Sequence, residues 1–160
     1  MKRILAIVGV VVMAALMQGV VLAQSNPMIG TWKMNAEKSK YSPAPGPKSL
    51  TVTIEAQGDG IKSTSEAVGP DGASTSWSYT ANYDGKDNPI TGTGAPGGAD
   101  TAELKRLGAN STLAILKKGG KVLRTGRFTV SKDGKVMKLV GKGKDADGKP
   151  VITSLVFDKQ

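Results

Sequence analysis

Arg124 is the residue whose type and position best suit it to bind another group. It alternates with Val122, Gly126, Phe128 and Val130, so these five side chains point to one side of a predicted strand. That side is mostly apolar and should face inward, where an unpaired charge is costly. Arg124 is therefore expected to be hydrated, to hold an acidic ligand group, to cover a tryptophan ring or to pair with an internal carboxylate. The residue pattern leaves these alternatives open.

A second arginine and three aromatic residues occupy similar positions. Arg106 shares the phase of two apolar side chains in another predicted strand, and Trp77, Tyr79 and Tyr83 share one phase of a third. The rings could stack on a ligand, carry a glycan if they faced outward, or pack in the core. Serines on the opposite phase favour the inward direction and core packing. The candidate ligand-binding residues are thus Arg124, Arg106, Trp77, Tyr79 and Phe128.

Catalytic and metal-binding chemistry find little support in the composition. The chain has no histidine and no cysteine. Histidine is the usual general base near neutral pH and the commonest metal ligand, and a familiar nucleophilic triad needs one of these two residues. The carboxylates fall mostly in turns or at solvated strand positions. We therefore expect no enzymatic activity, no cofactor and no metal site.

Two short motifs are better explained by turns. Residues 92–97 match Gly-x-Gly-x-x-Gly, but that motif binds a dinucleotide only where it opens a helix, and here Pro96 intervenes and a strand follows. We interpret this Gly-rich segment as a flexible loop at the mouth of a barrel, where it could gate entry. Residues 145–148 resemble the start of a calcium loop without its later ligands, and they are typical of a hairpin turn.

Period-two alternation dominates the chain after residue 24, and no helical periodicity is sustained there. Turn signals recur about every 10 to 15 residues. The predicted strands are 28–35, 48 to the turn at 57–60, 61–68, 74–83, 88–92, 100–107, 111–118, 121–131, 136–143 and 150–158. Such a meander predicts a single all-β, antiparallel up-and-down barrel of eight to ten strands, which closes on itself and so removes exposed edges.

One stretch between the first two strands is rich in proline. Pro43, Pro45 and Pro47 remove amide donors and fix φ, so residues 36–47 are predicted to be an extended loop. The loop could bind a proline-reading module. A stiff crossover over one end of the barrel explains it better.

Residues 1–23 are predicted to be a secretory signal peptide. Lys2 and Arg3 precede an apolar run, and the small-residue cleavage site ends at Ala23. The run could barely span a bilayer, and Gln18 and Gly19 interrupt it, which favours cleavage over an uncleaved anchor. Cleavage leaves residues 24–160 as one domain of a periplasmic or secreted protein.

The net charge of the chain after cleavage limits the classes of binding partner. Loss of Lys2 and Arg3 lowers the net charge from +9 to +7, and the lysines are scattered over turns and outward strand positions. A scattered basic surface could bind anionic membranes, lipopolysaccharide or acidic glycans weakly. It lacks the concentrated basic face that nucleic acid binding requires. We expect a monomer.

Three stretches resemble known barrel proteins. The Gly-Thr-Trp-Lys sequence of residues 30–33 resembles the Gly-x-Trp start of lipocalins and intracellular fatty-acid-binding proteins, and residues 156–160 resemble the ending of the latter. The sequence of residues 38–47, Lys-Ser-Lys-Tyr-Ser-Pro-Ala-Pro-Gly-Pro, resembles a Pro-rich stretch of small secreted bacterial proteins of unknown function. The resemblance implies a calycin barrel in which Gly30 and Trp32 close one end and a late cation packs across the indole. The candidate cations are Lys159, Arg124 and Arg127.

The chain also departs from these families. The Pro-rich loop stands where fatty-acid-binding proteins carry a helical lid, and their carboxylate-binding Arg-x-Tyr would fall on residues 155–157, which are Leu-Val-Phe. The usual fatty-acid clamp is therefore not expected. Two hypotheses remain: a barrel that binds a small, largely apolar or amphipathic ligand, and a filled barrel that contacts envelope components through its basic surface. Small residues at predicted inward positions favour room inside: Ser63, Ser65, Ala67, Ala102 and Gly126.

Overall fold

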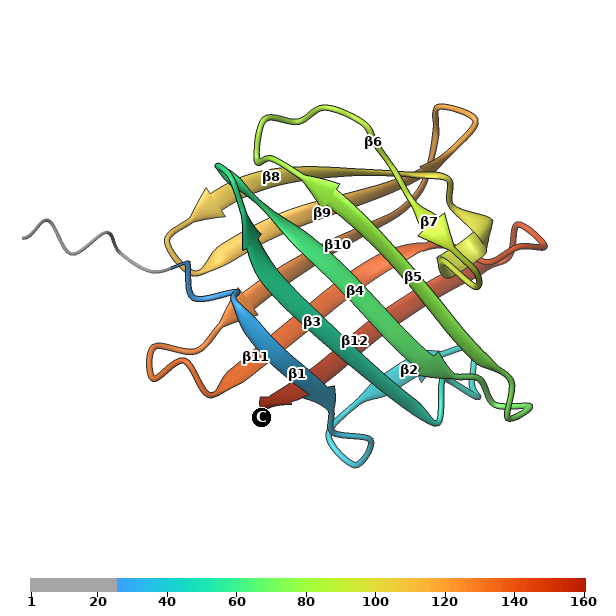
Figure 1. The fold of residues 1–160 in the computed structure, drawn as a ribbon. Helices are drawn as coiled ribbons and strands as arrows, with labels where there is room; N and C mark the ends of the chain where they lie inside the picture. Colours follow the sequence, from blue (N-terminus) through green and yellow to red (C-terminus); the bar gives the residue numbers. More distant parts are fainter. Residues whose placement is uncertain (1–25) are drawn as a thin grey trace, which may run out of the picture.

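A computed structural model describes residues 26–160, and the predicted signal peptide lies outside the described residues. Residues 26–160 form an antiparallel, nearly closed β-barrel (Figure 1). Within this range, no helix is long and apolar enough to cross a bilayer. The elements are β1 (Gly30–Met34), β2 (Lys40–Ser42), β3 (Ser49–Gln57), β4 (Gly60–Val68), β5 (Ser74–Ala81), β6 (Asn88–Pro89), β7 (Thr91–Gly92), the short 3₁₀ helix η1 (Pro96–Gly98), β8 (Thr101–Gly108), β9 (Ser111–Lys118), β10 (Lys121–Val130), β11 (Val136–Lys144) and β12 (Pro150–Lys159).

The barrel closes through its first strand. The strand order is β6-β8-β9-β10-β11-β12-β1-β3-β4-β5-β7. Trp32 of β1 lies opposite Lys159 of β12 on one side and opposite Val52 of β3 on the other. The all-β, antiparallel up-and-down barrel predicted from the sequence is therefore confirmed. The described residues hold twelve strands instead of eight to ten, because β2 was not predicted and the predicted strand 88–92 is divided into β6 and β7.

The Pro-rich segment is only partly the loop that was predicted. Residues 40–42 in the middle of it form β2, which pairs with the beginning of β12 so that Tyr41 lies opposite Thr153. The prolines follow β2 directly, and the chain then crosses one end of the barrel before β3 begins. The same edge of β12 therefore pairs with β2 near its beginning and with β1 near its end.

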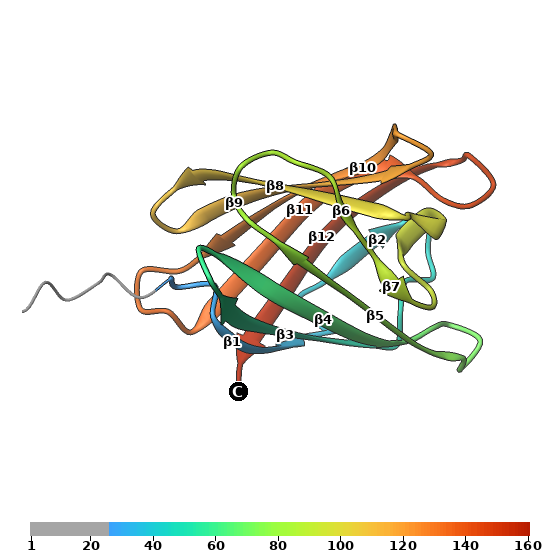
Figure 2. The same ribbon diagram turned by 45° about the horizontal axis from the view of Figure 1, so that its top comes forward.

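The strands β5 and β8 are not paired with each other, and the chain between them fills the opening. We call residues 84–92 the seam segment. Within it, β6 pairs with β8 and β7 pairs with β5 (Figure 2). The amide of Gly85 donates to the carbonyl of Leu104 at 3.1 Å, and the amide of Ile90 donates to the carbonyl of Asp100 at 2.8 Å. The seam segment thus bridges the two strands that the meander leaves apart.

A network of ion pairs holds the seam segment against the barrel. Lys117 Nζ lies 2.6 Å from Asp87 Oδ1 and 2.7 Å from Glu103 Oε2, and Lys105 Nζ lies 2.7 Å from Glu103 Oε1. Glu103 is buried. Hydrogen bonds from Lys105 and then Lys117 lower the pKa of its carboxyl group. The carboxylates of Asp87 and Glu103 raise the pKa of Lys117 in turn. This network ties the seam segment to β8 and β9.

One half of the barrel is filled by large apolar side chains. Trp32, Leu104, Met137 and Phe157 are fully buried there. The indole Nε1 of Trp32 donates to the carbonyl of Met28 at 2.8 Å, which satisfies the one polar atom of the ring. The rest of this packed end consists of Met28, Ile54, Ile61, Ala81 and Val130.

Lys159 is the cation that packs against Trp32. Its Nζ lies 5.0 Å from the centroid of the indole, within the range of a cation–π contact. Gly30 makes room for it: φ is +138° there, and a Cβ at this position would lie 2.6 Å from Lys159 Cε. The other two candidate cations lie elsewhere, because Arg127 donates to Ser111 Oγ at 3.0 Å and Arg124 points into the opposite end of the barrel.

Candidate ligand-binding site

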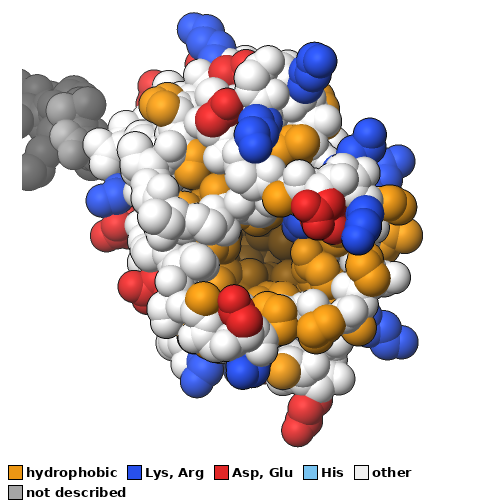
Figure 3. Space-filling view, turned by 90° about the vertical axis from the view of Figure 1, so that its right-hand side faces the viewer, with side chains coloured by type: hydrophobic (Ala, Val, Ile, Leu, Met, Phe, Trp, Pro, Cys, Tyr) orange, Lys and Arg blue, Asp and Glu red, His pale blue; other side chains and the backbone are white. Residues whose placement is uncertain are grey.

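The half of the barrel away from Trp32 contains a cavity of about 500 Å³. It opens at the end of the barrel, where Figure 3 shows a hollow surrounded by hydrophobic side chains. We call this opening the mouth. β3, β4 and β5 supply one wall, and β9 to β12 supply the other. The apolar residues that the strands contribute to the lining include Leu50, Val52, Ala67, Trp77, Ala114, Leu116, Phe128, Leu139, Val151, Leu155 and Phe157.

Small inward side chains leave this half of the barrel hollow. On β4 the inward positions after Ile61 are Ser63, Ser65 and Ala67, and all three of these smaller residues line the cavity. On β10 the inward position beside Phe128 is Gly126. Alternation places these residues inside, and their size leaves the volume unfilled. These four residues are among the five small residues whose predicted inward positions indicated a cavity in the barrel.

Aromatic side chains from two strands border the cavity. Trp77 and Tyr79 of β5 and Phe128 of β10 belong to the lining. Burial raises the pKa of the Tyr79 phenol, and the Ser63 hydroxyl partly offsets this shift. Tyr83, the third ring of the predicted stripe, lies outside the lining, and its hydroxyl accepts a hydrogen bond of 2.7 Å from Asn26. The stripe therefore divides between the cavity and the packed end.

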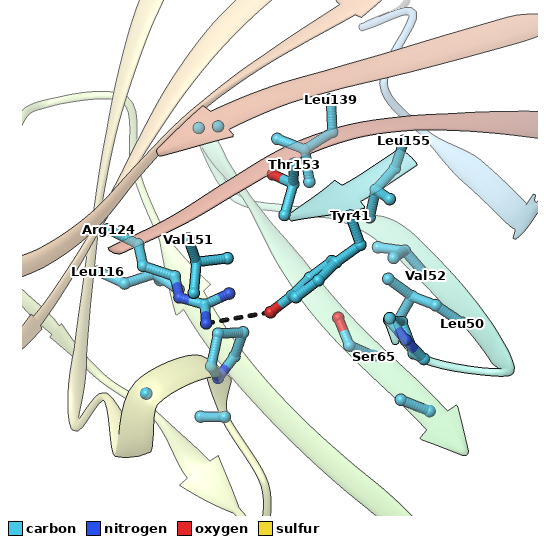
Figure 4. A pocket seen from close by; sticks show the side chains of 18 of the residues that line it. Tyr41, Leu50, Val52, Ser65, Leu116, Arg124, Leu139, Val151, Thr153 and Leu155 are labelled. Atoms are coloured by element: carbon cyan, nitrogen blue, oxygen red, sulfur yellow. Dashed lines mark hydrogen bonds between the residues drawn. The ribbon is translucent and has the colours of Figure 1, made fainter. Parts of the chain in front are cut away.

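Arg124 lies at the mouth with its side chain in the cavity wall. Its Nε donates to the carbonyl of Lys144 at 3.0 Å, and its terminal nitrogen donates to the Tyr41 hydroxyl at 3.2 Å (Figure 4). No carboxylate of residues 26–160 lies within 4.0 Å of it. The sequence left four roles open for Arg124. Among residues 26–160, it neither covers a tryptophan ring nor pairs with an internal carboxylate.

Arg106 lies outside the cavity. Its guanidinium carbon is 4.1 Å from the centroid of the Tyr83 ring, and the side chain is exposed. It shares the phase of Ala102 and Leu104, but no residue of β8 lines the cavity, and the pairing of β8 with β9 becomes irregular after Arg106. We therefore leave Arg106 out of the candidate site.

Two loops complete the mouth. Tyr41, Pro45, Gly46 and Pro47 line the cavity from the Pro-rich segment, and residues 94–97 line it from the Gly-rich loop around η1. A Cβ on Gly46 would lie 2.7 Å from Tyr41 Cβ, so the bare glycine lets the loop fold onto the tyrosine ring. Each loop was predicted to lie at an end of the barrel, and the structure places both at the mouth. The sequence held no signal for Tyr41 as a lining residue, since β2 is too short to show a period.

The lining offers apolar surface, several hydroxyl groups and the guanidinium of Arg124. Within the described range, no group of three or more metal-ligating side chains is placed to hold an ion. This combination suits a molecule with a large apolar part and few polar atoms, which is the usual composition of a small-molecule site.

Comparisons with known proteins add a likeness of fold. No protein-family model matches the chain, and no curated protein sequence does. Among solved structures, zebrafish ileal bile acid-binding protein complexed with cholic acid is similar, with a TM-score of 0.49 and 11% sequence identity. The match covers 84% of this chain and 99% of that chain. At this level of similarity, the cholic acid of that complex says nothing about the ligand of this chain.

Proposed function

We propose that this protein is a periplasmic or secreted binding protein, and not an enzyme, that holds a small and largely apolar molecule inside the barrel. The observation that carries the proposal is the cavity of about 500 Å³ with its apolar lining and open mouth. Small-molecule sites commonly measure roughly 300–1,000 Å³. The predicted signal peptide of residues 1–23 supports a location outside the cytoplasm.

The affinity would come from burial of apolar ligand surface, at about 25 cal/mol for each Å² removed from water. The walls are hydrogen-bonded strands of a nearly closed barrel, so little of this free energy is lost in ordering the site. The alternative of a filled barrel with an interacting outer surface describes the packed end around Trp32 only. The cavity beside Trp77 favours binding.

Two experiments test the proposal together. Native mass spectrometry of the protein purified from its own host without detergent should show an adduct of defined mass. Titration with fatty acids and isoprenoids should change the tryptophan emission, because Trp77 borders the cavity while Trp32 is buried away from it. The variant Trp77→Phe is the matched control, since it should keep binding and lose most of the signal. An adduct-free mass together with unchanged emission across the panel would overturn the proposal.

A further inference from the structure

The one charged side chain that faces the cavity from its described lining is cationic. Lys142 also belongs to the lining, but it lies on the exposed, outward phase of β11 opposite the exposed Ile152, so Arg124 supplies the charge, and the described lining contains no aspartate or glutamate. Cations that border an apolar space of low dielectric attract anions more strongly than they would in bulk water. The charge of the cavity therefore favours a ligand with a negative group over a neutral or cationic one.

Arg124 has donors to spare for such a group. A guanidinium carries five N–H donors, and this one makes hydrogen bonds to the Lys144 carbonyl and the Tyr41 hydroxyl. The carbonyl fixes the orientation of the side chain without neutralising its charge. Gly143 leaves room for the arginine stem, because a Cβ there would lie 2.4 Å from Arg124 Cγ. The result is a positioned guanidinium whose planar fork suits a carboxylate or another oxyanion.

Tyr41 adds a second donor at the same place. Its hydroxyl oxygen accepts the hydrogen bond from Arg124, which leaves its own O–H hydrogen to donate to a third group. Figure 4 shows the ring extending from beside Leu155 toward Arg124. An oxyanion beside both groups would thus accept hydrogen bonds from a charged and a neutral donor.

We propose that the ligand is an amphipathic anion with one terminal acidic group, bound head-outward. The acidic group lies at the mouth between Arg124 and Tyr41, and the apolar body extends toward Leu155 and Phe157 at the floor. The inference rests on the proposed function and deepens it, since it names the chemical class and the orientation of the ligand. The direction follows from the position of Arg124, which lies at the mouth, whereas the floor is apolar.

Three probes with one tail and different heads test the charge preference. Dodecanoate, dodecanol and dodecylamine are titrated into the protein, with Trp77 emission and calorimetry as readouts. Dodecanoate should bind about tenfold or more tightly than dodecanol, because charge-assisted hydrogen bonds contribute on that scale. Dodecylamine should bind most weakly. Equal affinities for the three heads would overturn the inference and leave the proposed function standing, whereas no binding of any of them would overturn both.

Variants test which residues cause the preference for dodecanoate over dodecanol. Arg124→Gln should abolish the preference for dodecanoate while dodecanol still binds, which also shows that the variant folds. Tyr41→Phe should lower dodecanoate affinity severalfold and leave dodecanol unaffected, since only the O–H donor is lost. Arg106→Gln is the matched control, because Arg106 lies outside the cavity, and it should change neither affinity. A preference for dodecanoate that survives in Arg124→Gln would remove this residue from the site.

The orientation has its own test. Dodecanoate labelled with ¹³C in its carboxyl group is bound to the wild-type protein, and a water-soluble paramagnetic agent is added. A head group at the mouth should show strong relaxation enhancement of its carboxyl signal, and a label at the far methyl group should show little. The reverse pattern would overturn the head-outward orientation.

Discussion

The two halves of the barrel differ in the size of their inward side chains, although the same strands build both. On β4, Ile61 packs in the closed end with Trp32, while Ser63 and Ser65, two and four residues further on, border the cavity. The strand period and pairing are unchanged between these positions. Side-chain volume therefore decides which half of this barrel is a packed core and which half encloses a cavity. Stability and ligand binding should accordingly be separable by substitutions along one strand.

The largest expected effect is on the closed end. Trp32→Ala should lower the free energy of unfolding by about 3–5 kcal/mol, because it removes a fully buried ring from a packed environment. Trp77→Ala should cost clearly less, since Trp77 is half-buried and already borders an open volume. Urea unfolding followed by circular dichroism measures both without relying on tryptophan emission. Equal losses, or a loss below about 1 kcal/mol for Trp32→Ala, would contradict the division into two halves.

Much of this division follows from local sequence patterns. The alternation around Ile61 and around Trp77 gave the inward faces, and β9 has the bounds that its pattern predicts, residues 111–118. The inward direction of Arg124 followed from its apolar neighbours of the same phase. Period-two arguments work here because each long strand has one face toward the interior and the other toward solvent.

The rest depends on contacts between distant segments. Periodicity tells which side of a strand a residue faces and not its height in the barrel, so Arg106 had the same pattern as Arg124 but lies away from the cavity. Tyr41 meets Arg124 across 83 residues of sequence. The β2 strand that carries Tyr41 has only three residues and precedes prolines, so its pairing with β12 left no local signal.

The seam segment offers a way to perturb the barrel wall without touching either half. The pKa of Glu103 is lowered in the folded protein from its ordinary value of 4.5 by hydrogen bonds from Lys105 and Lys117. The ionised carboxylate therefore contributes stability above pH 4.5, and this contribution is lost as the pH falls through the lower folded-state pKa. Glu103→Gln should be less stable than the wild type at neutral pH, and the difference should shrink in acid.

Hydrogen exchange locates this effect. The amides of Gly85 and Ile90, which bond to the main chain beside β8, should lose protection in Glu103→Gln at neutral pH. Amides around Trp32 should keep theirs. Urea midpoints at neutral pH and at about pH 3 supply the stability difference. A Glu103→Gln variant whose deficit stays constant with pH would show that the ion pairs do not hold the seam segment.

A cavity-filling substitution tests the half of the barrel that contains the cavity. Ser65→Phe should occupy volume between the walls and weaken binding of an apolar probe at least about tenfold, or about 1.4 kcal/mol. The free energy of unfolding should change by less than about 1 kcal/mol, because the ring enters empty space and buries apolar surface. Calorimetric titration and urea unfolding measure the two quantities.

Ser76→Phe is the matched control for this substitution, since Ser76 lies on the outward, exposed phase of β5. It should leave the affinity unchanged. A filled variant that binds as well as the wild type would place the ligand outside the cavity. A large loss of stability in Ser65→Phe would show that the open half is packed as tightly as the closed one.

The smallest expected effect concerns the cation over Trp32. Lys159→Met should lower the free energy of unfolding by about 0.5–1 kcal/mol, because it keeps an apolar stem but removes the charge 5.0 Å from the ring centroid, at an exposed site. Lys138→Met, which removes an exposed lysine of β11, should cost nothing measurable. Ligand affinity should be unchanged in both variants, since neither residue lines the cavity. A change in ligand affinity for Lys159→Met would mean that the packed end and the cavity are coupled through the strands they share.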